Sequence, residues 1–256
     1  MWAFAARLAE LERTGTPAAL VTVTKVEGSV PREVGAKMVV RPGRLFDGTI
    51  GGGHLEELVL AEAEACIAEG ASKTLRYPLG PSAGQCCGGV VELFVDVLHT
   101  GPSLILFGAG HVGQAVMRVM VGTAFRVHVV DDRSEWLDAP EVPKAVVRHH
   151  GPWDEMVDEL TWDAKRTHVA VMTHRHDVDQ AIVEHVLRRP HAYLGLIGSR
   201  TKWAKFRARL GEKGVTKEAL DSVKCPIGLD VGGKAPAEVA VSVAAELLRL
   251  HHRGLR

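Results

Sequence analysis

The chain has 256 residues, 46% of them hydrophobic, and its 31 basic side chains balance 31 acidic ones. This is enough apolar material for one large or two smaller packed domains. The absence of a basic cluster argues against nucleic acid as a partner. The sequence has no run of about 20 apolar residues that could span a bilayer, and its first residues lack the apolar core of a signal peptide. We therefore expect a globular, cytoplasmic protein that is not an integral membrane protein.

The two halves of the sequence differ in their predicted elements. Residues 1–99 contain a short helix, two β-like stretches, a helix from about His54, and two further β-like stretches. From residue 102 onward, strands and helices alternate, which is typical of a parallel sheet wound with helices. The predicted fold class is therefore α/β, with an N-terminal α+β domain (1–99) and a Rossmann-like parallel-sheet domain (102–256).

Two glycine-rich segments stand out in the first half. The segment EGSVPREVGAKM carries two cations, and GTIGGGHLEEL places three consecutive glycines before a helix. Three glycines in a row favour a backbone that a ligand approaches closely, whereas a flexible turn, the alternative, needs only one or two. The two segments together are predicted to hold an anionic ligand. Its candidate contacts are Arg32, Lys37, Gly51, Gly52 and Gly53.

The segment QCCGG places Gln85, Cys86 and Cys87 before two glycines and a strongly β-like run. A disulfide between adjacent cysteines requires strained geometry, so a structural crosslink is not expected. The four cysteines of the chain form no CxxC pair, which argues against a zinc knuckle and favours reduced thiols. The paired thiols therefore need another explanation.

The clearest sequence motif of the second half is LILFGAGHVG. It places Gly108, Gly110 and Gly113 in GxGxxG spacing after an apolar strand and at the head of a helix. Such glycines permit a tight turn and close approach of a pyrophosphate, and Asp131, about 20 residues on, would bind ribose hydroxyls. This order of strand, glycine turn, helix and acidic residue predicts a Rossmann turn. Nucleotide binding stays open, because glycines at such a turn also serve helix–sheet packing.

Two further strand ends carry polar groups. His174 follows one predicted strand in the segment THRHD, and Ser199, Arg200 and Lys202 follow the next strand in GSRTK. Both segments are expected at the carboxyl edge, where open α/β sheets bind ligands. THRHD fits a helix cap with exposed histidines equally well. GSRTK combines a helix N-terminus with two cations and favours an anion, although these cations also fit a solvated helix face.

These stretches together resemble a known family. In chain order, the segments GSVPREVGAKM, GTIGGGHLEE, QCCGGVVELF, LILFGAGHVG, VVDDR, MTHRHDVD, YLGLIGSRTK and CPIGLDVGGKAPAEVAVSVAAEL are similar to the xanthine dehydrogenase accessory proteins of the XdhC/CoxI family. The resemblance covers nearly the whole chain. It implies an accessory protein rather than an enzyme: a chaperone that binds the molybdenum cofactor, supports its sulfuration with a cysteine desulfurase, and inserts it into an apo molybdenum hydroxylase such as xanthine dehydrogenase. It also implies a homodimer.

The resemblance suggests a role for the paired cysteines. A sulfurated molybdenum centre is soft and thiolate is a soft ligand, so Cys86 or Cys87 is the candidate molybdenum contact; burial of two small residues at the start of a strand is the alternative. The pterin phosphate is then predicted at the GAGHVG turn, which includes His111, or at the GSRTK helix, in a cleft between the domains. Whether the cofactor is molybdopterin or its dinucleotide form stays open.

Two competing hypotheses remain. The first is an NAD(P)-dependent oxidoreductase that uses the GAGHVG turn and Asp131, with His174 and Lys202 as its candidate acid–base groups. It leaves the glycine-rich first half unexplained. The second is a nucleotide-sensing or interaction domain without ligand chemistry of its own.

Overall fold

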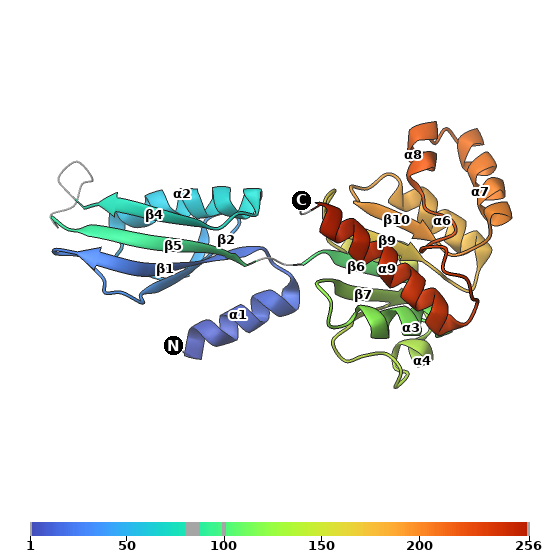
Figure 1. Cartoon of the computed structure of the whole chain (residues 1–256), viewed down its shortest axis with the longest axis horizontal. Helices are drawn as coiled ribbons and strands as arrows, with labels where there is room; N and C mark the ends of the chain where they lie inside the picture. The colour runs from blue at the N-terminus through green and yellow to red at the C-terminus, as the bar shows by residue number, and fades with distance from the viewer. Residues whose placement is uncertain (1, 80–87, 99–100, 255–256) are drawn as a thin grey trace. The chain divides into compact units, whose positions relative to one another are not determined.

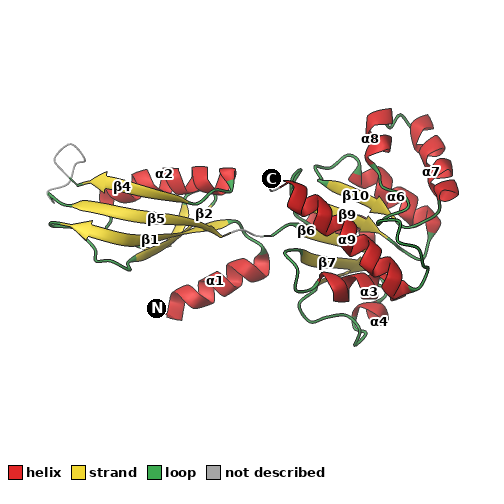
Figure 2. Ribbon diagram, viewed as in Figure 1, coloured by secondary structure: helices red, strands yellow, loops and turns green. Residues whose placement is uncertain are grey.

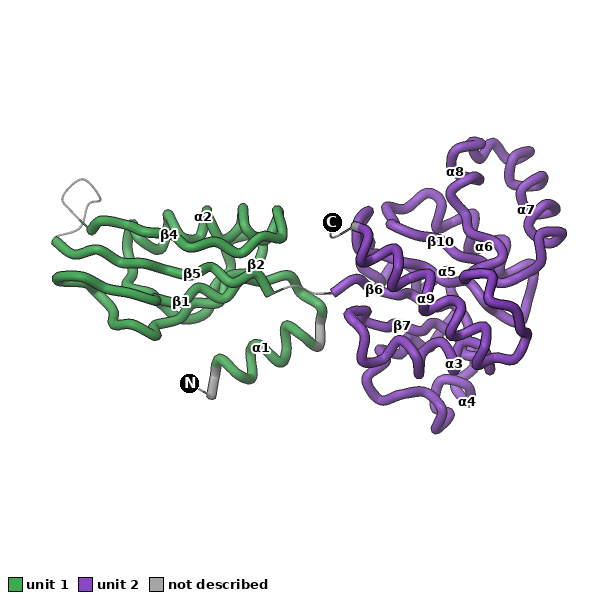
Figure 3. Tube along the Cα trace, in the orientation of Figure 1, with its two compact units in different colours: residues 1–100 green, residues 101–256 purple. Residues whose placement is uncertain are grey.

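The computed structural model describes residues 2–79, 88–98 and 101–254. The chain divides into two compact units, residues 1–100 and 101–256 (Figure 3). Within the described ranges, no helix is both long enough and apolar enough to cross a membrane. The two units are taken in turn, with the element labels of Figure 1.

Unit 1 is built on a five-stranded antiparallel sheet in the order β3-β2-β1-β5-β4. Its elements are α1 (Trp2–Thr14), β1 (Ala18–Glu27), β2 (Lys37–Arg41), β3 (Leu45–Gly48), α2 (Gly53–Glu69), β4 (Lys73–Pro78) and β5 (Val90–Leu98). The strand β1 lies in the centre and pairs with β2 on one side and β5 on the other (Figure 2).

Alternation along the strands divides the core of unit 1 between the two faces of the sheet. Val21 and Val23 of β1 pack in one cluster with Val59 of α2. Ala18 lies an odd number of residues before both Val21 and Val23, and it packs in a second cluster with Leu11 of α1. Successive side chains of a strand point to opposite faces, so α2 and α1 cover opposite faces of this sheet.

Unit 2 is a parallel five-stranded sheet in the order β10-β9-β6-β7-β8. Its strands are β6 (Ser103–Phe107), β7 (Arg126–Asp131), β8 (Val147–His150), β9 (Thr167–Val171) and β10 (Tyr193–Leu196). Its helices are α3 (His111–Met120), α4 (Ser134–Leu137), α5 (Trp153–Glu159), α6 (His176–Val186), α7 (Arg200–Glu212), α8 (Lys217–Ser222) and α9 (Pro236–Gly254).

Both faces of the parallel sheet are covered, as its apolar strands require. Leu104 and Leu106 of β6 belong to a cluster that includes residues of α3 and α9. Ile105 and Phe107 of the same strand belong to a cluster with residues of α5, α6 and α7. Figure 2 shows α9 crossing the strands on the first of these faces. The predicted fold class, an α+β first half and a Rossmann-like second half, is confirmed.

The strand order determines where a ligand site is expected in unit 2. The chain leaves β6 toward β7 and β8 on one side, and it later returns to β9 and β10 on the other side of β6. Open α/β sheets bind ligands at the carboxyl ends of the strands where the order reverses in this way. In unit 2 that point lies between β6 and β9.

Candidate functional site

The GAGHVG turn joins β6 to α3, and chain packing requires glycine at two of its three glycine positions. Gly108 has φ +112°, and a Cβ there would lie 2.4 Å from the carbonyl oxygen of Met172. A Cβ on Gly113 would lie 2.1 Å from the carbonyl oxygen of Gly108. A Cβ on Gly110 would meet no atom of the described residues within 4 Å. Chain packing therefore excludes a side chain at two of these positions, and it leaves open space at Gly110, beside the N-terminus of α3.

The carboxylate of Asp131, at the end of β7, accepts hydrogen bonds from two other residues of the protein. It accepts hydrogen bonds from the backbone N–H of Ala109 (2.7 Å), from the backbone N–H of Arg133 (3.0 Å) and from two guanidinium nitrogens of Arg133 (both 2.8 Å). Burial opposes ionisation, but these hydrogen bonds outweigh it and lower the pKa of Asp131. The predicted ribose acceptor thus holds the glycine turn against β7, and its role toward a nucleotide stays a prediction.

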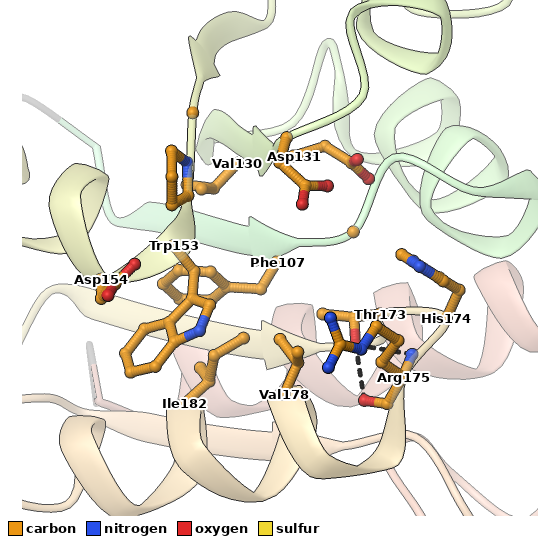
Figure 4. A pocket seen from close by; sticks show the side chains of 14 residues that line it. Phe107, Val130, Asp131, Trp153, Asp154, Thr173, His174, Arg175, Val178 and Ile182 are labelled. Carbon is orange, nitrogen blue, oxygen red and sulfur yellow. Dashed lines mark hydrogen bonds between the residues drawn. The ribbon is translucent and has the colours of Figure 1, made fainter.

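A cavity of about 210 Å³ lies at the reversal point of the sheet (Figure 4). It is bounded by the ends of β6 and β7, by the segments that follow β8 and β9, and by parts of α5 and α6. The labelled side chains in Figure 4 form an apolar side around Trp153 and Phe107 and a polar side with Asp131 and His174. The lining residues are Phe107, Gly108, Val130, Asp131, Asp132, Gly151, Pro152, Trp153, Asp154, Thr173, His174, Arg175, Val178 and Ile182.

The two histidines predicted as ligand contacts line different cavities. His174 is exposed and lines the cavity at the sheet edge. His111 opens α3 and lines a separate groove of about 440 Å³ with residues of α3 and α4. Its ring packs edge-on against Trp136, with the ring centres 5.0 Å apart. The structure therefore does not bring these two predicted contacts into one cavity.

The GSRTK segment opens α7, where Ser199 caps the helix by accepting a hydrogen bond from the backbone N–H of Lys202 (3.1 Å). The Lys202 ammonium lies 2.6 Å from a carboxylate oxygen of Asp179 and 3.0 Å from the carbonyl oxygen of Ile197. The other carboxylate oxygen of Asp179 accepts from the N–H and the hydroxyl of Thr173. Lys202 is therefore held in an ion pair that joins the ends of β9 and β10, while Arg200 remains exposed.

In unit 1, the three-glycine segment folds around a carboxylate that the sequence interpretation did not single out. Glu56 Oε1 accepts hydrogen bonds from the Thr49 hydroxyl (2.5 Å) and from the backbone N–H groups of Ile50 (3.0 Å) and Gly52 (2.9 Å). Partial burial opposes ionisation, but these donors lower the pKa of Glu56. The available sequence signal was an acidic residue in the first helical turn behind a threonine, a variant of the capping box.

The glycine-rich loops of unit 1 lie against one another. A Cβ on Gly51 would lie 2.5 Å from Pro31, and a Cβ on Gly89 would lie 2.4 Å from the carbonyl oxygen of Ser29. A Cβ on Gly28 would lie 3.2 Å from the Cα of Gly89. The loop after β1 therefore lies in close contact with the loop before α2 and with the chain entering β5, and there is no room for a side chain at Gly51 or Gly89.

Two of the remaining predicted contacts in unit 1 differ in surroundings. Arg32 is exposed in the loop after β1. The ammonium of Lys37 lies 3.0 Å from the Thr22 hydroxyl, and Lys37 lines a groove with residues of α1. Gly52 and Gly53 have positive φ, and no atom of the described residues lies within 4 Å of the place of a Cβ, so backbone conformation favours glycine there.

The predicted metal contacts Cys86 and Cys87, and Gln85 beside them, lie outside the described residues. Cys87 is followed directly by Gly88 and Gly89 in the sequence. Among the described residues, no group of three or more histidine, cysteine, aspartate or glutamate side chains is arranged to hold a metal ion.

The parallel sheet of unit 2, its strand order and the glycine turn between β6 and α3 define a Rossmann-type domain. Residues 104–247 match the sequence model of the XdhC Rossmann domain. Residues 11–78 match that of the XdhC and CoxI family. The chain belongs to the XdhC and CoxI family, as its sequence motifs predict.

Curated proteins from two bacteria are similar to this chain. An uncharacterized protein, YqeB, of Escherichia coli K12 is 32% identical over 94% of this chain and 45% of its own length. A protein of Bacillus subtilis 168, named as a probable subunit of xanthine dehydrogenase, is 29% identical over 63% of this chain and 47% of its own length. The molybdenum cofactor insertion chaperone PaoD of E. coli K12 is 23% identical over 93% of this chain and 85% of its own length.

This chain thus spans about half the length of the first two curated relatives. A similar solved structure is a crystal structure titled as a xanthine dehydrogenase from Bacillus halodurans. It has a TM-score of 0.52 and 20% identity, and the match covers 97% of this chain and 95% of the other. This last similarity shows a shared fold.

Proposed function

We propose that this protein is an accessory protein for the molybdenum cofactor. It binds the cofactor, supports its sulfuration by a cysteine desulfurase, and inserts it into an apo molybdenum hydroxylase such as xanthine dehydrogenase. It does so in the cytoplasm, as a homodimer and without catalysing substrate turnover. Similarity to a relative named as a molybdenum cofactor insertion chaperone, extending over 93% of this chain, supports the proposal.

The observation that carries the proposal is the meeting of three glycine-rich loops in unit 1. Gly28, Gly51 and Gly89 belong to three separate segments; a side chain at Gly51 or Gly89 would clash with the loop after β1, and a Cβ on Gly28 would lie 3.2 Å from Gly89. One of these segments continues directly from Cys86 and Cys87. Thiolate is the ligand type that suits a sulfurated molybdenum centre, so the two cysteines that precede Gly88 and Gly89 in the sequence are the proposed metal contacts.

The residues of unit 2 fit the phosphate of such a cofactor. Gly110 leaves open space beside the N-terminus of α3, where free backbone N–H groups favour an anion. An NAD(P)-dependent oxidoreductase has less support. One of its two candidate acid–base groups, Lys202, is engaged with Asp179 in a nearly buried ion pair.

The proposal is tested by replacing both Cys86 and Cys87 with serine. The substitutions exchange soft sulfur for hard oxygen at nearly constant size, so we expect loss of bound molybdenum and of transfer to apo xanthine dehydrogenase in a protein that still folds. Sulfuration is measured separately, as the activity of the reconstituted hydroxylase with and without the cysteine desulfurase. A folded double variant with full molybdenum loading and undiminished transfer would show that the two thiols are not the molybdenum contacts.

The matched control is Cys225→Ser. Burial raises the pKa of Cys225 to about 11, so this thiol is protonated at neutral pH and offers no thiolate to a metal. We expect Cys225→Ser to retain molybdenum. Cys66→Ser serves as the burial control: Cys66 is in the core of unit 1, and a hydroxyl there should lower the thermal midpoint without a specific loss of metal.

A further inference from the structure

Helix α2 of unit 1 presents an exposed line of mostly small side chains that is flanked by acids. The line follows intervals of three, four and three residues, the spacing of the contact positions in a coiled coil. Its members, all exposed, are Leu58, Ala61, Ala65 and Ala68. The positions on either side of this line, which correspond to e and g of a heptad, are all glutamates: Glu57, Glu62, Glu64 and Glu69.

Helix α7 of unit 2 repeats this arrangement with the opposite charge. At the same intervals it carries a line of small side chains, again all exposed: Thr201, Ala204, Ala208 and Gly211. The flanking positions hold three cations and one acid: Arg200, Lys205, Arg207 and Glu212. Figure 1 shows α7 on the outside of unit 2. Both helices therefore offer a flat outer side with charged borders, one acidic and one basic.

The flanking charges are available to a partner. Within the described ranges, Glu69, Arg200 and Lys205 form no salt bridge. Arg207 and the other three flanking glutamates form salt bridges with residues of their own unit, yet at least 31% of each of these side chains stays exposed. Charges at e and g positions determine which helix faces which. Two copies of α2 would place acid against acid, whereas α2 against α7 pairs opposite charges at most flanking positions.

We propose that α2 of one copy of this chain packs along α7 of a second copy, and that a symmetric homodimer makes this contact twice. The small side chains allow the two helices to approach closely, and the 37% exposed Leu58 gains an apolar surface to cover it. The proposal rests on the homodimer of the proposed function and names its interface. Each line covers about 15 Å of helix, so the dimer depends on both contacts.

Charge reversal on one helix at a time tests the contact, with sedimentation of the full chain as the measurement. Glu57→Lys/Glu69→Lys makes the border of α2 more basic, and Arg200→Glu/Lys205→Glu makes that of α7 acidic. Each double variant alone places like charges in both contacts, so we expect dimerisation about tenfold weaker or more. An equimolar mixture of the two variants pairs opposite charges again in both contacts, and it should form a mixed dimer with nearly wild-type affinity. High salt should weaken the wild-type dimer by screening these exposed charges.

The matched control is Glu141→Lys/Glu155→Lys, which makes the same change of charge at two exposed positions outside both helices. It should dimerise like the wild type. A wild-type dimer that neither double variant weakens, or a mixture that fails to restore it, would overturn this interface and leave the homodimer standing. A wild type that stays monomeric at about 100 μM would overturn both, because a dissociation constant above that value corresponds to a contact of less than about 6 kcal/mol. No cofactor is present in the measurement, so its failure is distinguishable from a failure of cofactor insertion.

Discussion

Replacing Lys202 with methionine removes the cation from a buried ion pair and keeps most of the side-chain volume. The side chain of Asp179 is 0% exposed and that of Lys202 is 12% exposed. In the variant, Asp179 keeps its two hydrogen bonds from Thr173 but faces no cation. Breaking such a pair costs about 3–5 kcal/mol, and a domain of this size then loses roughly 10 °C of thermal midpoint.

Urea unfolding followed by tryptophan fluorescence measures this loss, because four of the five tryptophans lie in unit 2. Lys205→Met is the matched control on an exposed position of the same helix, and it should change the free energy of unfolding by less than about 0.5 kcal/mol. The double variant Lys202→Met/Asp179→Asn removes both charges, so it should recover most of the loss. A loss below about 1 kcal/mol in Lys202→Met, or no recovery in the double variant, would refute a stabilising buried pair.

Three further outcomes are expected. Gly113→Ala should destabilise the protein by about 2 kcal/mol or more, because its Cβ would overlap a backbone carbonyl. Gly110→Ala should leave the thermal midpoint unchanged and weaken only ligand binding, since no atom of the described residues lies within 4 Å of its Cβ. Glu56→Gln should cost about 1–2 kcal/mol in urea unfolding, because a charged acceptor of three hydrogen bonds becomes neutral. Burial and the nearby His149 lower the pKa of His128 to about 4, so the free energy of unfolding should fall, by up to about 3 kcal/mol, as the pH falls from about 6.5 to 4.

Each of these outcomes has a result that contradicts it. Equal thermal midpoints and ligand affinities for Gly110→Ala and Gly113→Ala would show that the glycines are interchangeable. A Glu56→Gln variant as stable as the wild type at pH 7 would mean that the loop does not depend on the carboxylate's charge. The pH dependence is attributed to His128 only if His128→Phe flattens the decline between pH 6.5 and 4; an unchanged slope would assign it to other groups.

Element order and the Rossmann turn were predictable because their signals are local. The residues of LILFGAGHVG are consecutive, and a strand, a tight turn and a helix start each depend on neighbours within a few positions. Packing then explains Gly108 and Gly113 individually: each faces a backbone carbonyl that approaches within 2.4 Å of the place of a Cβ. The alternation of strands and helices likewise predicted a parallel sheet wound with helices.

The candidate site was predicted less completely, because a sequence lists donors and acceptors without saying which of them meet. Asp131 accepts the N–H of Ala109, 22 residues away, a partner that the sequence did not identify. Lys202 is paired with Asp179, 23 residues away, a partner that the sequence likewise did not identify. The partner of each side chain depends on which strand ends are neighbours in the sheet.

The sequence by itself determined the family, the two-part α/β architecture and the glycine turn, since these follow from motif order and local periodicity. Only the tertiary structure decided that Trp153, Asp132 and His174 line one cavity. They come from segments after three different strands, and no spacing along the chain connects them. The parallel sheet brings them together by placing β6 between β7 and β9, so that the carboxyl ends of distant strands share one edge.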